Sequence, residues 1–204
     1  MILYSDKDDH YSHRVRIVLA EKDVACEIKE TTNHDAPEEV LSINPDHSLP
    51  VLVDRELGLY SPAVMLEYLD ERFPHPPLLP VYPVNRANCR TLMLRIDKEI
   101  SPLVDNLIAR SGTEKEILAT KQDLLHEIIS LAPTFKEFKY FMNEEFSLCD
   151  CYLAPILWRL PSLGINLPLN RHTKPLLDYQ KRIFDRPGFQ DSLSLVERNL
   201  TSTI

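Results

Sequence analysis

The first seventy residues alternate between short apolar runs and amphipathic stretches. Apolar residues cluster at 2–4, and the stretch that follows places Val15, Val18 and Leu19 at helical spacing, with Ser12 as a candidate N-cap. Later apolar runs bounded by turn residues predict strands, and two stretches that open with proline predict helices. The order is therefore βαβαββα, with elements expected at residues 2–4, 11–22, 26–29, 37–43, 51–53, 57–60 and 62–72.

The pattern changes after about residue 85. Long periodic stretches at 85–109 and 114–131 predict helices, and no strand-like alternation interrupts them. The fold expected from the pattern is an α/β N-terminal half followed by an all-α half.

A proline-rich segment, 73–83, lies between the two halves, and five of its eleven residues are proline. Proline fixes φ and removes an amide donor, so this segment is expected to be stiff, exposed and polyproline-like. Two interpretations follow from the residues alone. The segment is a rigid linker, or it is a surface that displays side chains to a partner.

The net charge, the lengths of the apolar runs and the cysteine spacing exclude several classes of function. The 204 residues have a formal net charge of −8, which argues against direct sequence-specific DNA binding. No apolar run approaches the roughly 20 residues of a membrane span, and the N-terminus does not resemble a signal peptide, so a cytoplasmic protein is expected. Four cysteines without framework spacing are expected to be thiols there, and neither they nor His10 and His13 predict a metal site.

The layout resembles the glutathione transferase superfamily, in which a thioredoxin-like half precedes a helical half. Leu49-Pro50 matches the dipeptide with a cis proline before the third strand, where backbone groups of the family pair with glutathione. Phe146-Ser147-Leu148-Cys149-Asp150 matches the capping box before the central buried helix, which assigns Ser147 and Asp150 a structural role.

The expected chemistry of that superfamily is incomplete in this chain. Asp9 stands where Cys- or Ser-using members place their nucleophile, and a carboxylate there would repel a glutathione thiolate. Ser61-Pro62 replaces the Glu/Asp-Ser pair that binds the γ-glutamyl group. Tyr4 and Ser12 still offer hydroxyl donors, so a glutathione-dependent transferase or thiol-transfer enzyme remains the alternative. The positions interpreted as a vestigial glutathione site are Asp9, Ser12, Leu49, Pro50 and Ser61.

Within the superfamily, the stretch 67–84 with its Pro-His-Pro block resembles the stringent starvation protein A family, as do 11–22, 52–57 and 150–161. This resemblance implies a stress-response transcription regulator without enzymatic activity or cofactor. It implies a homodimer that binds RNA polymerase holoenzyme through the primary sigma factor, and it assigns the contact to Pro74, His75, Pro76 and Tyr82. The implied parts are a thioredoxin-like domain at 1–73, a linker and partner surface at 74–84, and an all-helical domain at 85–204.

Overall fold

The computed structural model describes residues 1–33 and 35–200, which form two compact units. Of the described residues, the first unit contains 1–78 and the C-terminal stretch 186–200, and the second contains 79–185. The boundary between the units therefore lies inside the proline-rich segment. The domain expected at 85–204 differs from this division, because the described residues after Asp185 pack with the first unit.

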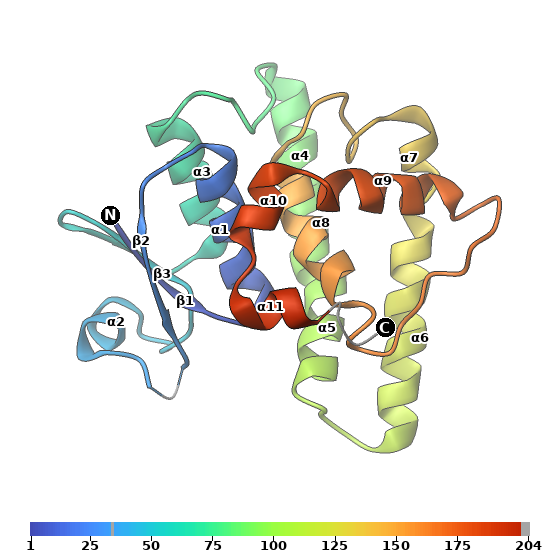
Figure 1. Cartoon of the computed structure of the whole chain (residues 1–204), viewed down its shortest axis with the longest axis horizontal. Helices are drawn as coiled ribbons and strands as arrows, with labels where there is room; N and C mark the ends of the chain where they lie inside the picture. The colour runs from blue at the N-terminus through green and yellow to red at the C-terminus, as the bar shows by residue number, and fades with distance from the viewer. Residues whose placement is uncertain (34, 201–204) are drawn as a thin grey trace. The chain divides into compact units, whose positions relative to one another are not determined.

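The first unit is built on a mixed four-stranded sheet of order β2-β1-β3-β4 (Figure 1). Its strands are β1 (Ile2–Asp6), β2 (Glu27–Thr31), β3 (Val51–Asp54) and β4 (Leu57–Leu59). β1 and β2 are parallel and are joined by helix α1 (His10–Glu21), as a parallel pair requires, whereas the other pairs are antiparallel. The predicted thioredoxin-like βαβαββα order is confirmed.

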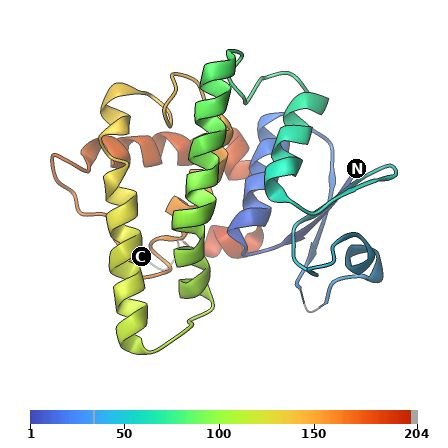
Figure 2. The ribbon, with the colours of Figure 1, turned by 180° about the vertical axis from the view of Figure 1, so that it is seen from behind.

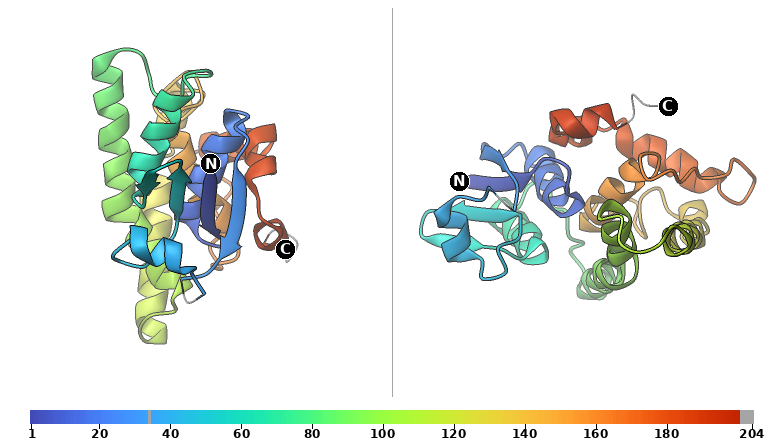
Figure 3. Two further views of the ribbon diagram at one scale, coloured as in Figure 1. Left: turned by 90° about the vertical axis from the view of Figure 1, so that its left-hand side faces the viewer. Right: turned by 90° about the horizontal axis from the view of Figure 1, so that it is seen from below.

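Helices cover both faces of this sheet (Figure 3). Because side chains alternate along a strand, Tyr4 and Val51 point to the face where Val40 of helix α2 (Glu38–Ile43) packs. Leu3 and Leu52 are buried on the opposite face, where α1 packs against helix α3 (Pro62–Arg72). The ends of α3 coincide with the prediction.

The second unit is helical, as expected. The predicted helix at 85–109 is a chain of three segments: α4 (Pro83–Arg95), a π-helical turn (Ile96–Ile100) and α5 (Ser101–Ile108). This rod lies beside α6 (Glu114–Ser130), as Figure 2 shows. The short helix α7 (Thr134–Glu137) leads to α8 (Leu148–Arg159), which is buried along its whole length, and α9 (Lys174–Phe184) packs against α8.

The chain then returns to the first unit as α10 (Pro187–Ser192) and α11 (Leu195–Asn199). α10 packs against α1, with the Phe189 ring buried beside the His13 imidazole. The Arg186 guanidinium holds the Glu21 carboxylate through two hydrogen bonds, of 2.5 and 2.8 Å. These contacts explain why the C-terminal helices belong with the α/β unit. Among the described helices, none is both long and apolar enough to span a membrane.

Candidate functional site

The positions predicted for a vestigial glutathione site lie along one edge of the sheet of the first unit. In the register of β1 and β3, Tyr4 lies opposite Val51, so Pro50 adjoins the end of β1 and the loop that leads to Asp9. Leu52 lies opposite Leu59 of β4, which directs the chain toward Ser61 at the same edge. The sheet therefore brings these positions to one edge. Which ligand they could bind depends on whether each polar group there is free or already hydrogen-bonded within the protein.

Asp9 is the N-cap of α1. One carboxylate oxygen accepts the Tyr11 N–H at 3.1 Å and the other accepts the Ser12 N–H at 2.6 Å. The prediction that Ser12 caps this helix is therefore wrong, because Asp9 lies directly before the first helical residue and its side chain reaches both amides. The helix N-terminus is already neutralised by an internal carboxylate, where an active transferase would place a thiolate.

The Leu49–Pro50 peptide bond is cis, as predicted. The Leu49 N–H donates a hydrogen bond of 3.1 Å to the side-chain oxygen of Asn33. A peptide ligand that paired with this part of the backbone would have to displace that amide. Ser61 is the N-cap of α3 without a side-chain capping bond, and Pro62 in the first turn offers no N–H.

The two hydroxyls of the enzymatic alternative are both engaged. Tyr4 donates to the Glu39 carboxylate, which together with burial raises the pKa of Tyr4 to about 12. A tyrosine that stabilises a thiolate needs a free hydroxyl and a lower pKa. The buried Ser12 hydroxyl accepts the Asp6 N–H at 3.1 Å. The sequence did not predict that Glu39 would accept the Tyr4 hydroxyl or that Asn33 would accept the Leu49 N–H. Asn33 lies in a turn and Glu39 in a short helix between β2 and β3, where no local pattern indicates the partner of a side chain.

The second candidate site is the loop 74–77, whose four residues are all exposed. The expectation of a continuous polyproline-like backbone is wrong at one point, because the His75–Pro76 peptide bond is cis. Leu78 and Leu79 follow as buried residues, so they anchor the end of the loop. The exposed stretch is therefore a short displayed loop and not a uniform rod.

A buried ion pair between Lys22 and Asp70 forms hydrogen bonds with the backbone in and beside this loop. The Lys22 ammonium lies 2.8 Å from Oδ1 of Asp70 and donates to the carbonyl oxygens of Phe73 (2.6 Å) and Pro76 (2.7 Å). The same Asp70 oxygen accepts the Leu78 N–H at 2.8 Å. Lys22 is 6% exposed and Asp70 8% exposed. We call these two residues the clamp, because their contacts fix both ends of the loop.

The sequence did not predict the clamp. The charged residues Glu67, Asp70, Glu71 and Arg72 predict a solvated helix face, and for Asp70 this prediction is wrong because its side chain is buried against Lys22. The available signal was its helical spacing from Leu66, since residues four apart share one face of a helix. Both are buried on α3. Beside the loop lies an open depression of about 450 Å³, lined by residues 22–25 and 72–75.

Tyr82 belongs to the second unit, where it is the N-cap residue of α4 and is 73% exposed. Val81 and Val84 beside it are also exposed. Residues 81–84, at the end of the proline-rich segment and just after it, therefore display one exposed aromatic and two exposed aliphatic side chains. Such amphipathic groups dominate the energy of many protein interfaces.

Ser147 and Asp150 form the predicted capping box of α8. The Ser147 N–H donates to Asp150 at 2.8 Å, and the same carboxylate accepts the Phe141 N–H (2.9 Å) and the Tyr179 hydroxyl (2.8 Å). Burial raises the pKa of Asp150 to about 6, although each of these hydrogen bonds acts in the opposite direction. This carboxylate joins three segments of the second unit and has a structural role.

The described residues hold no group of three or more His, Cys, Asp or Glu side chains arranged to bind a metal ion. His13, one of the two histidines considered from the sequence, lies within 2.9 Å of the Ser192 hydroxyl and 3.4 Å of the Glu197 carboxylate. It is fully buried in the first unit.

Comparison with known proteins agrees with this picture. Residues 3–77 match the N-terminal domain family of glutathione S-transferases, and 92–187 match the C-terminal domain family. Among solved structures, the bacterial transferase BphK superposes with a TM-score of 0.85 at 20% identity, covering 97% of this chain and 100% of that one. Omega 3C glutathione transferase from Trametes versicolor has a TM-score of 0.81 at 25% identity, covering 95% of this chain and 88% of that one.

Closer relatives are found by sequence. The stringent starvation protein A homolog of Coxiella burnetii is 48% identical over 98% of this chain and 94% of its own length. The homolog of Haemophilus influenzae is 47% identical over 95% of this chain and 90% of its own length. With its transferase fold and its similarity to these homologs over nearly the whole chain, this chain belongs to the stringent starvation protein A family.

Proposed function

We propose that this protein is a cytoplasmic regulator of transcription that contacts RNA polymerase holoenzyme through its primary sigma factor, without transferase activity. The observation that supports it best is the exposed Pro74-His75-Pro76 loop held by the clamp. A loop fixed before binding loses little conformational entropy when a partner binds it. Tyr82 adds the second part of the proposed contact.

The charge of the protein suits this role. A net charge of −8 favours rapid encounter with a basic protein surface and disfavours DNA as a direct ligand. The proposed partner is therefore a protein subunit of the transcription complex.

The test is binding of purified holoenzyme to the immobilised protein. Replacing Pro74, His75 and Pro76 together with alanine should weaken binding at least tenfold, and Tyr82→Ala should weaken it less. Pro45→Ala combined with His47→Ala is the matched control, because it removes an exposed proline and an exposed histidine from another loop of the first unit. Equal binding by the triple variant and this control would remove the loop from the interface.

The proposed homodimer has a candidate surface on α3. Val64 is exposed there and lines an open depression of about 410 Å³ with Ala63, Glu67, Tyr68 and Glu71. Light scattering of the purified protein should give the mass of two chains, and Val64→Glu should shift it toward one. A monomeric wild-type protein would contradict this part of the proposal.

A glutathione-dependent enzyme is the second candidate, and the match of residues 3–77 to the N-terminal domain family of glutathione S-transferases favours it. It predicts retention on immobilised glutathione and thiol transfer to common electrophiles. We expect neither, because Asp9 occupies the helix N-terminus and Asn33 occupies the Leu49 N–H. Retention together with turnover would overturn the proposed absence of activity.

A further inference from the structure

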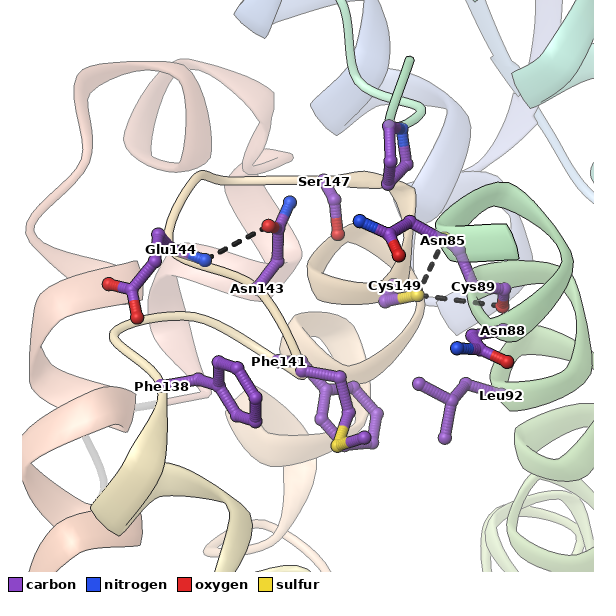
Figure 4. A pocket seen from close by; sticks show the side chains of 12 residues that line it. Asn85, Asn88, Cys89, Leu92, Phe138, Phe141, Asn143, Glu144, Ser147 and Cys149 are labelled. Atoms are coloured by element: carbon purple, nitrogen blue, oxygen red, sulfur yellow. Dashed lines mark hydrogen bonds between the residues drawn. The ribbon is translucent and has the colours of Figure 1, made fainter. Parts of the chain in front are cut away.

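Two cysteines of the second unit, Cys89 and Cys149, lie on two different helices with their side chains in contact. The Sγ atoms of Cys89 on α4 and Cys149 in the first turn of α8 are 2.7 Å apart (Figure 4). The Cys149 thiol also lies 3.5 Å from the Cys89 carbonyl oxygen. A disulfide bond is about 2.05 Å long, so a small side-chain movement would bring these sulfurs to bonding distance.

A cavity gives access to this pair. It has a volume of about 240 Å³, and both cysteines line it together with the amide side chains of Asn85, Asn88 and Asn143. Asn85 and Asn88 are exposed, so residues in contact with solvent border the cavity. A water molecule takes up about 30 Å³ in the liquid, so a small polar oxidant fits this space.

We propose that Cys89 and Cys149 form a redox-active dithiol that hydrogen peroxide entering this cavity oxidises to an intramolecular disulfide. In the first step one sulfur attacks a peroxide oxygen, the O–O bond breaks, and a sulfenic acid and one water form. In the second step the other thiol attacks the sulfenic sulfur, the S–S bond forms and a second water leaves. Two thiols and one hydrogen peroxide thus become one disulfide and two waters.

The other two cysteines lack this arrangement. Cys151 lies two positions further along α8, where a helix directs its side chain to a different face from that of Cys149. Cys26 belongs to the first unit. The hydrogen bond to Cys89 and burial raise the pKa of Cys149 well above its ordinary value. The Cys149 side chain therefore remains a thiol at neutral pH, and its oxidation is expected to be slower than that of an ionised surface cysteine.

The test uses the full chain, purified in its reduced form and treated with hydrogen peroxide. After the peroxide is removed with catalase, remaining thiols are alkylated and the intact mass is measured. Two of the four thiols should escape alkylation, with the loss of two hydrogen atoms. Peptide mapping without reductant should recover Cys89 linked to Cys149, and dithiothreitol should restore all four thiols.

Cys89→Ser should abolish the intramolecular disulfide, whereas Cys26→Ser should form it as the wild-type protein does. Circular dichroism checks that both variants are folded, and the wild-type peptide map decides the question even if Cys89→Ser is not. Four alkylated thiols after peroxide treatment would overturn the proposal. So would a disulfide between other cysteines, or oxidation that stops at sulfinic acid on Cys26.

Discussion

Buried charges determine the local geometry of both units at the scale of single residues. The clamp is an example, because Lys22 and Asp70 are almost fully removed from water and satisfy three backbone groups in and beside the loop 74–77. A buried ion pair adds little net stability compared with well-packed apolar residues, yet removing one partner is costly. The clamp is therefore better explained by the position it gives to the loop than by stability.

Lys22→Met is expected to lower the free energy of unfolding by about 3–5 kcal/mol, because it leaves the Asp70 carboxylate buried and unpaired. Urea denaturation measures this loss. The same variant should bind holoenzyme more weakly at a temperature where it is still folded, since the carbonyls of Phe73 and Pro76 lose their common donor.

Lys29→Met is the matched control, because the Lys29–Glu27 pair is exposed and its charged atoms are 3.9 Å apart. Exposed pairs contribute about 0–1 kcal/mol, so this variant should leave both measurements almost unchanged. Full holoenzyme binding by a folded Lys22→Met protein would show that the clamp does not position the loop.

Asp150 gives a prediction about pH. Its pKa in the folded protein is about 6 against an ordinary value of 3.8, so the folded state holds the proton more tightly than the unfolded state. The stability this group contributes is fully present below pH 3.8 and is lost as the pH rises through 6. The difference in unfolding free energy between wild type and Asp150→Asn should fall by about 2 kcal/mol from pH 4 to pH 7.

The second capping box of the helical unit is the control for this measurement. Glu116 accepts the Thr113 N–H at 2.7 Å, and this bond lowers the pKa of Glu116. The stability that Glu116 contributes is therefore present at neutral pH and is lost as the pH falls. This pH dependence has the opposite sign to that of Asp150. Parallel pH profiles for Asp150→Asn and Glu116→Gln would contradict the assignment of burial as the cause.

At the scale of elements, the start of α1 depends on one side chain. Asp9 satisfies two of the amides that a helix N-terminus leaves without partners. Asp9→Ala should lower the free energy of unfolding by about 1 kcal/mol, and Asp9→Asn should lose less because its amide oxygen still accepts a hydrogen bond. Thermal or urea denaturation compares the two. Equal stability of wild type and Asp9→Ala would show that α1 does not need this cap.

Local signals explain which elements were predictable from the sequence. The helices α3 and α6 begin and end close to their predicted bounds because each combines a clear start with strong apolar periodicity. The capping box of α8 was predictable for the same reason, since its residues are three apart. The cap of α1 was difficult to assign because three capping residue types, Asp8, Asp9 and Ser12, lie within five positions, and Ser12 proved to lie inside the helix.

Long-range contacts explain what was missed. Lys22 and Asp70 lie on different helices, as do Cys89 and Cys149, and no local pattern connects the members of either pair. The same limit applies to Asn33. It lies in a turn that is distant in sequence from Leu49, and its side-chain oxygen accepts the Leu49 N–H. The sequence predicts a vestigial glutathione site from the residues at Asp9 and Ser61, but the hydrogen-bond partners at these positions could be found only in the structure.

At the scale of the whole molecule, the chain leaves the first unit after Leu78 and returns to it at Arg186. The first unit is therefore completed by a segment that follows the helical unit in sequence. Arg186 pairs with Glu21, and Arg16 pairs with Glu197 at 2.6 Å, with Phe189 buried between α10 and α1. This connectivity makes a specific prediction about a cut in the linker.

A protease recognition sequence inserted between Pro80 and Val81 should be cleaved readily, because Val81 is exposed. The two fragments should still elute together from a gel-filtration column, since the larger one supplies α10 and α11 to the sheet-bearing unit. Phe189→Ala should weaken this association, because truncating a buried phenylalanine costs about 3–5 kcal/mol. Separation of the wild-type fragments in native buffer would mean that the C-terminal helices do not hold the first unit together.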